Sequence, residues 1–165
     1  FQYTYVGSPM VYYGDETGMW GADDPDDRKP MVWKELSYDD EVNHPFSHKR
    51  PRDRNAFNAD LHKWYQKLGK LRDEREELKT GKYKFIQTGK SQTLAFVRFN
   101  ENQEVSVIAV NRDEKESKVT LKIPVDIAKR PYNFKNALNN IAISTSGNNS
   151  ITFQLPPLSA AVFTN

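Results

Sequence analysis

Hydrophobic and polar positions along the chain follow two different periods, and the period changes near residue 80. Before that point, apolar residues recur every three or four positions along one stretch, which is typical of one buried face of a helix. The residues of this stripe are Phe57, Leu61, Trp64, Leu68, Leu71 and Leu78. They predict a helix over about residues 58–79. Asn55 or Asn58 can cap its start with a side-chain oxygen, and Gly81 can end it in a left-handed conformation.

From residue 82 onward, apolar and polar positions alternate in short runs that are separated by Gly, Asn, Asp and Ser. Alternation of this kind predicts β-strands with one buried face, joined by tight turns. The expected strands are 82–87, 93–99, 104–111, 118–123, 132–136, 141–144, 150–155 and 159–164. Eight short antiparallel strands at this spacing predict a Greek-key β-sandwich.

The run from Pro9 to Tyr13 is apolar throughout and is closed by Gly14. A continuous apolar run predicts a strand buried on both faces, as in a parallel sheet covered by helices. One such strand and one helix cannot complete a sheet, because the strand needs neighbours to pair with. The chain also opens on Phe1, not on Met. We therefore expect it to come from the interior of a longer protein, with residues 1–80 forming the last βα unit of an upstream α/β domain.

The charged residues are nearly balanced, with 24 Lys+Arg against 22 Asp+Glu and a net charge of +2, and there is no cysteine. This balance argues against a nucleic-acid partner, and no apolar run approaches the ~20 residues that span a bilayer. The absence of cysteine excludes disulfides, thiolate zinc sites and thiol nucleophiles. The basic cluster Lys49, Arg50, Arg52 and Arg54 has no interleaved aromatic residues, so we expect it to be solvated surface.

Residues 14–54 form a long polar stretch, which in a compact fold is usually functional or disordered. Two metal-site patterns in it fail on inspection. A calcium loop starting at Asp24 would place Arg28 and Lys29 where an oxygen ligand and glycine are needed. His44 and His48 have the spacing of a metal pair on a helix, but a proline lies between them. We expect no metal and no cofactor.

The stretch from Val6 to Met19 reads V-G-S-P-M-V-Y-Y-G-D-E-T-G-M. It closely resembles the eighth barrel strand and turn of α-amylase-type enzymes, glycoside hydrolase family 13. The continuation from Gly21 to Trp33 contains D-P-D-D-R-K-P-M-V-W and resembles the neopullulanase, cyclomaltodextrinase and maltogenic amylase group. The resemblance implies the end of a (β/α)8 barrel, a TIM barrel fragment over 1–80, followed by a C-terminal β-sandwich over 81–165.

The family hydrolyses α-glucosidic bonds with retention, using three carboxylates on earlier barrel strands. The resemblance therefore implies that this chain contains no catalytic residue. Asp15 and Glu16 are adjacent, so on an extended segment they would point in opposite directions and could not flank one bond. The resemblance implies that Asp24 and Arg28 contact the sugar, although an Asp–Arg pair that only braces the loop is the alternative. Trp20 and Trp33 are candidates for stacking on pyranose rings, although packing of the loop against the barrel is the alternative for both.

These observations leave two functional hypotheses. In the first, the chain is the C-terminal part of an α-glucan hydrolase, and its partners are an α-glucan oligosaccharide and the upstream barrel. In the second, it is a non-catalytic carbohydrate-binding or packing module. All three tryptophans, Trp20, Trp33 and Trp64, precede residue 80, so the sandwich lacks the indole platforms of an independent sugar-binding domain.

Overall fold

The computed structural model describes residues 1–21, 23–44, 46, 48–127, 132–139, 141–147 and 149–165. These residues form two compact units. One joins Phe1–Pro9 to Leu68–Asn165, and the other is Met10–Lys67. The longest helix, α1 (Ala59–Glu74), contributes residues to both units.

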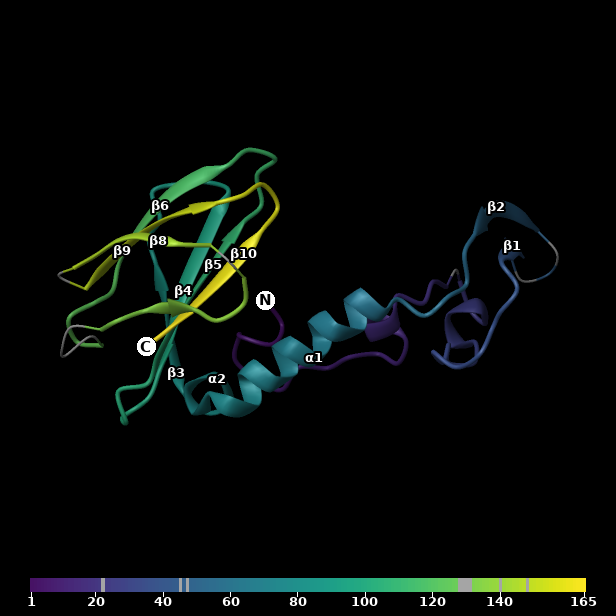
Figure 1. Cartoon of the computed structure of the whole chain (residues 1–165), viewed down its shortest axis with the longest axis horizontal. Helices are drawn as coiled ribbons and strands as arrows, with labels where there is room; N and C mark the ends of the chain where they lie inside the picture. The colour runs from purple at the N-terminus through teal and green to yellow at the C-terminus, as the bar shows by residue number, and fades with distance from the viewer. Residues whose placement is uncertain (22, 45, 47, 128–131, 140, 148) are drawn as a thin grey trace. The chain divides into compact units, whose positions relative to one another are not determined.

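The larger unit is built around two antiparallel sheets, which lie face to face as a sandwich (Figure 1). The five-stranded sheet has the order β3-β4-β5-β10-β7, and the three-stranded sheet has the order β6-β9-β8. The strands are β3 (Lys82–Ile86), β4 (Thr93–Phe99), β5 (Val105–Asn111), β6 (Ser117–Lys122), β7 (Lys135–Asn136), β8 (Ile143–Gly147), β9 (Ser150–Leu155) and β10 (Ala160–Thr164). The predicted antiparallel sandwich is thereby confirmed. A strand lies near each expected place, but β7 has only two of the five predicted residues and β8 begins two residues later than predicted.

The core of the sandwich comes from the alternate residues of the facing strands. The larger sheet contributes Val97 and Val107 to this core, and the smaller sheet contributes Leu121 and Phe153; all four side chains are fully buried. Phe153 also packs on Phe163, with ring centroids 4.6 Å apart. Because side chains alternate between the two faces of a strand, the residues between these positions point to the outer face.

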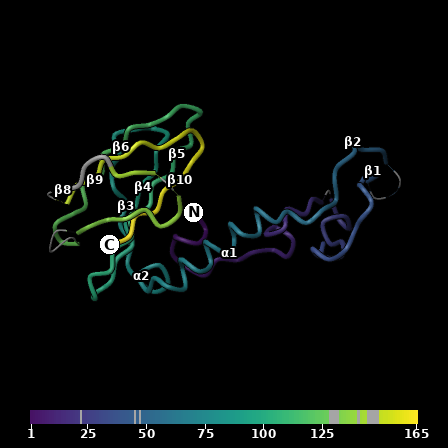
Figure 2. The backbone as a smooth tube through the Cα atoms, viewed as in Figure 1, coloured from purple at the N-terminus to yellow at the C-terminus, as the bar shows by residue number. Residues whose placement is uncertain are grey.

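The outer face of the five-stranded sheet is also apolar. Phe96 and Ile108 are buried there in a second cluster with Leu71 of α1 and Leu78 of α2 (Glu76–Lys79). Tyr5 packs against the same cluster. The N-terminal segment runs beside the end of α1 in Figure 2. This sheet is therefore covered on both sides, by the second sheet and by helical and N-terminal residues.

Two arginines hold the backbone of the N-terminal segment. Arg98, fully buried on β4, donates to the carbonyl oxygens of Thr4 (2.9 Å), Tyr5 (2.8 Å) and Gly81 (2.9 Å). Arg72 of α1 donates to the carbonyls of Tyr3, Tyr5 and Gly7. Burial lowers the pKa of the Arg98 guanidinium, the nearby Arg72 charge lowers it further, and Glu77 opposes both. The buried charge is thus satisfied mainly by backbone carbonyls.

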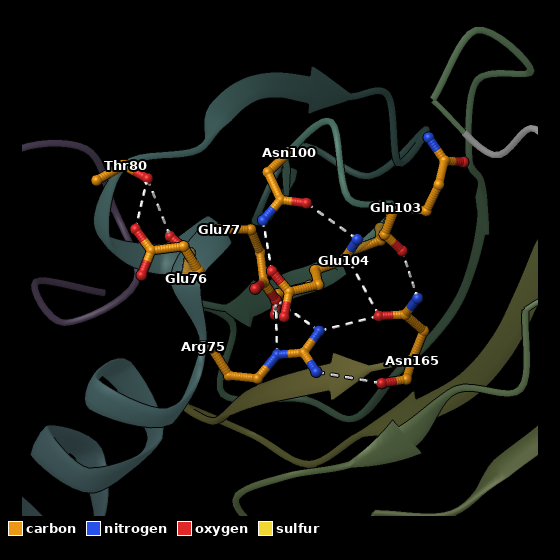
Figure 3. Close-up of polar contacts among 10 residues, drawn as sticks. Arg75, Glu76, Glu77, Thr80, Asn100, Gln103, Glu104 and Asn165 are labelled. Carbon is orange, nitrogen blue, oxygen red and sulfur yellow. Dashed lines mark hydrogen bonds and ion pairs between the residues drawn. The ribbon is translucent and has the colours of Figure 1, made fainter.

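The junction between the helices and the sheet is a polar network (Figure 3). Arg75 donates from Nε to the buried carboxylate of Glu77 at 2.7 Å, and from Nη2 to the Asn165 side-chain oxygen at 2.9 Å. Ser106 donates to the same Glu77 oxygen at 2.6 Å. The backbone at Arg75 is extended, with φ −119° and ψ 102°. The single helix expected over 58–79 is therefore two helices, because this residue leaves the helical conformation.

Gly81 ends α2 for a different reason from the one expected. Its φ is not in the left-handed range. A Cβ added to Gly81 would lie 2.4 Å from the carbonyl oxygen of Glu77 and 2.7 Å from that of Phe99. Glycine is needed because two backbone segments approach it closely. At the other end of the helical region, Asn58 caps α1 as predicted, accepting from the Leu61 backbone N–H at 3.0 Å.

The smaller unit contains more structure than the sequence predicts. The 3-10 helices η1 (Asp15–Thr17) and η2 (Asp26–Arg28) are followed by the antiparallel strands β1 (Glu41–Asn43) and β2 (Lys49–Asp53). The strand expected at Pro9–Tyr13 is not formed in this chain. No sheet of the described residues includes it, and Met10 is 80% exposed. A parallel strand forms only beside a neighbouring strand, and none lies next to this segment among the described residues. The structure therefore does not show the barrel fragment expected before the sandwich.

Candidate functional site

The candidate site is a pocket of about 240 Å³ in the 10–67 unit. Two segments that the resemblance singled out form its walls, the tyrosine-containing turn and the acid-rich loop. The lining residues are Tyr12, Tyr13, Gly14, Asp15, Met19, Trp20, Gly21, Asp27 and Lys29. Trp20 is the predicted site residue that the structure brings into this pocket.

Gly14 shapes the turn that carries these residues. Its φ of 97° is in the left-handed region, where a side chain is strained. Its carbonyl oxygen accepts from the Met19 N–H at 2.9 Å, and its own N–H donates to Glu16 Oε2 at 3.0 Å. A Cβ on Gly14 would lie 2.6 Å from the Met19 sulfur. Glycine at this position therefore permits the turn that precedes Trp20.

Trp20 is held by a buried cation. The guanidinium carbon of Arg50 lies 3.1 Å from the centroid of its ring. Arg50 Nη1 is 2.7 Å from Glu41 Oε2, and a second ion pair joins Arg50 to Asp53. Lys29 also pairs with Glu41, and its Nζ lies 5.6 Å from the Trp20 ring. Trp20 nevertheless stays 43% exposed, so a braced aromatic surface is open to a ligand.

The prediction that the whole basic cluster is solvated is wrong for Arg50. Only 1% of its side-chain surface is exposed, because the ion pairs and the Trp20 ring enclose it. Sequence reasoning also missed the ion pair of Lys29 with Glu41. No spacing rule connects these residues, since the β1–β2 pairing and the loop bring them together.

Asp24 and Arg28 lie on the same loop but do not line the pocket. They pair with each other, with Arg28 Nε donating to Asp24 Oδ1 at 2.6 Å, and each side chain is 61% exposed. The Arg28 charge still acts on a residue of the pocket, Tyr12. Desolvation, with smaller contributions from Tyr13 and Asp27, raises the pKa of Tyr12, and Arg28 acts in the opposite direction. The structure therefore groups Trp20, Asp27 and Lys29, and leaves Asp24 and Arg28 as an exposed pair.

Metal binding and membrane insertion can also be compared with the described residues. Within this part of the chain there is no group of three or more His, Cys, Asp and Glu side chains placed to hold a metal ion. His44 and His48 instead belong to the β1–β2 turn, where the His44 N–H donates to the His48 carbonyl at 2.6 Å. No helix in the described ranges is long and apolar enough to cross a membrane.

Known proteins match both the sandwich and the preceding region. Residues 85–165 match the family of α-amylase C-terminal all-β domains. Neopullulanase 2 from Thermoactinomyces vulgaris is 38% identical over 125 residues, which cover 75% of this chain and 18% of that protein. The chain belongs to the α-amylase family. A cyclomaltodextrinase from a Bacillus species is 34% identical over 115 residues, covering 69% of this chain and 17% of its own length.

Solved structures extend the likeness of this α-amylase-family chain to its full length. A debranching enzyme from Nostoc punctiforme is 21% identical, with a TM-score of 0.73, and the match covers 99% of this chain and 29% of the enzyme. At this identity the match shows the fold alone. The chain spans under a fifth of the length of the two curated relatives. The boundary expected at residue 80 and the sugar contacts of Trp20, Asp24 and Arg28 stay predictions.

Proposed function

We propose that the chain is part of a retaining α-glucan hydrolase, in which it supplies one wall of the sugar site and a scaffold sandwich. The observation that carries the proposal is the half-exposed indole of Trp20, clamped beside a pocket whose loop also presents Asp24 and Arg28. The relatives named neopullulanase and cyclomaltodextrinase give the class of substrate. The expected ligand is an α-glucan oligosaccharide of the starch, pullulan or cyclodextrin type.

The chemistry of this loop suits a sugar. A pyranose has an apolar face that an indole can cover, and hydroxyl groups that need donors and acceptors. Arg28 offers a planar fork of N–H donors, and Asp24 offers carboxylate oxygens. Their mutual pairing orients both groups, and their exposure leaves other donors and acceptors free for hydroxyls.

The loop is also braced in the way that a binding site requires. Arg50 and Lys29 both pair with Glu41, and the Tyr13 hydroxyl donates to the Lys29 carbonyl at 2.9 Å. Contacts of this kind hold the recognising groups in place before the ligand arrives, which reduces the entropy lost on binding.

The proposal assigns the catalytic carboxylates to another part of the enzyme. Of the two adjacent acids, Glu16 already accepts the Gly14 N–H, so its carboxylate serves the turn. We therefore predict that the purified chain will release no p-nitrophenol from p-nitrophenyl maltoside above the buffer rate, because it has neither nucleophile nor proton donor. A turnover that disappears on mutating Asp15 or Glu16 would contradict this assignment.

In this proposal the sandwich packs against the rest of the enzyme. The alternative is that the sandwich binds sugar by itself. Tyr83 and Phe85, alternate residues of the edge strand β3, are 45% and 50% exposed beside Tyr5. An exposed aromatic strip of this kind suits contact with an upstream barrel. Isothermal titration of residues 81–165 with maltoheptaose would separate the two roles, since millimolar binding would favour an independent sugar-binding module.

A further inference from the structure

A second concave surface lies in the 10–67 unit, away from the residues assigned above. It is a groove of about 380 Å³ between the loop that carries Trp33 and the first turns of α1. Trp33, Phe57 and His62 supply its rings, and the polar groups come from Lys34, Glu35, Lys63 and Gln66. Its volume falls within the roughly 300–1,000 Å³ typical of small-molecule sites. None of these residues lines the Trp20 pocket.

Trp33 is presented by an ordered loop. Its indole is 57% exposed, while the preceding residue, Val32, is buried and anchors the loop. The backbone N–H of Trp33 donates to the Tyr38 hydroxyl at 2.7 Å, and its carbonyl accepts from Leu36 at 3.3 Å. A large aromatic side chain is thus kept at the surface by a fixed backbone.

The helix wall is equally defined. The rings of Phe57 and His62 are 5.1 Å apart and inclined by 57°. The His62 N–H donates to the carbonyl of Asn58, the residue that caps the helix. Lys63 and Gln66 then follow on the same helical wall. The groove therefore has aromatic rings on both walls and a rim with donors and an acceptor.

The geometry points to this groove as a secondary binding site for a linear α-glucan segment, with Trp33 stacking on a pyranose ring. The lining carries charges of both signs, Lys34 and Lys63 against Glu35, and this mixture favours neither a polyanion nor a polycation. The combination of rings, amide and ammonium groups suits a neutral molecule with apolar faces and hydroxyl edges. The choice of an α-glucan as the ligand rests on the proposed function, whereas the existence of a binding site is inferred from the volume and lining of the groove.

The three tryptophans allow one experiment to test both sites. In the ¹⁵N-labelled chain, the indole N–H signals of Trp20, Trp33 and Trp64 can be assigned with Trp→Phe variants and followed during titration with maltoheptaose. We expect the Trp33 signal to shift saturably. Trp64 lies on α1 outside the groove and serves as the internal control. A Trp33 signal that does not respond would overturn this inference.

Variants then test whether the groove makes the contact. His62→Ala should weaken the titration seen at Trp33 at least threefold, and Trp33→Ala should weaken calorimetric binding at this site about tenfold, which corresponds to roughly 1.4 kcal/mol. Trp64→Ala should leave the Trp33 titration within twofold of the unmodified chain. An unchanged titration of the Trp33 signal in His62→Ala would exclude the groove as the glucan-binding site, even if Trp33→Ala did not fold.

The same spectra distinguish this inference from the proposed function. A response of Trp33 without Trp20 would support the groove and count against the Trp20 pocket. A response of Trp20 alone would do the reverse. If neither indole responds, both glucan sites are rejected, and contact with another protein becomes the better explanation for the exposure of Trp33.

Discussion

Arg98→Met should lower the free energy of unfolding of the sandwich unit by about 3–5 kcal/mol, since each buried carbonyl left without a donor costs about 1–3 kcal/mol. Methionine fills a similar volume but cannot donate, so the carbonyls of Thr4 and Gly81 lose the Arg98 bond, whereas the Tyr5 carbonyl keeps its bond from Arg72. Because Arg98 joins residues far apart in the sequence, its loss should also free the N-terminal segment. Urea unfolding followed by circular dichroism measures the change.

Arg112→Met is the matched control for this substitution. Arg112 follows β5 and is exposed, and among the described residues its side chain makes one long contact, of 3.5 Å, with the Ser91 carbonyl. Its replacement should change stability by less than about 0.5 kcal/mol, as for most surface positions. A loss below 1 kcal/mol in Arg98→Met would show that the carbonyls find other donors.

Gly81→Ala should be the other strongly destabilising change, with a loss of about 3 kcal/mol or more, at the upper end of the effects of overpacking. The added methyl group would meet two carbonyl oxygens, those of Glu77 and Phe99, at 2.4 and 2.7 Å. Neither oxygen can move freely, because Glu77 accepts the Gly81 N–H and Phe99 is paired with Lys82. Relief of the clash therefore requires separation of α2 from the sheet.

Gly69→Ala makes a control of opposite sign. Gly69 lies within α1, and its new Cβ would meet only the Tyr3 ring, at an ordinary 3.8 Å. Replacing a helical glycine with alanine should stabilise the chain by up to about 1 kcal/mol. Thermal unfolding should thus give a lower melting temperature for Gly81→Ala and a higher one for Gly69→Ala. A melting temperature of Gly81→Ala that equals or exceeds that of the unmodified chain would contradict the close approach at Gly81.

The sandwich was the most predictable part of the fold. Strand β4 begins and ends at the predicted residues, and β5 starts one residue later than expected. The reason is that alternation along these strands follows directly from burial of one face. The same rule failed to find Arg98, because an arginine on the outer face of a strand normally indicates solvent. Its burial is explained by tertiary contacts with the carbonyls of residues 4, 5 and 81.

The 10–67 unit was less predictable for the opposite reason. Strand β2 buries a single residue, Arg50, so it carries no hydrophobic pattern. The apolar run Pro9–Tyr13 has the composition of a buried strand, yet a strand exists only when another strand pairs with it. The candidate site was found through the resemblance of its loop, whereas the clamp of Arg50 on Trp20 required the folded structure.

The most direct test of the central claim is the effect of Arg28→Ala on long and short substrates in the glycoside hydrolase that we propose contains this chain. If Arg28 donates to sugar hydroxyls, kcat/KM for maltoheptaose should fall about 10- to 100-fold, since a hydrogen bond to a charged donor contributes roughly 1.5–3 kcal/mol. Arg28→Lys should recover only part of the loss, because the fork is missing. The rate on p-nitrophenyl maltoside should be nearly unchanged. Equal losses on both substrates, together with a lower melting temperature, would show that Arg28 only braces Asp24.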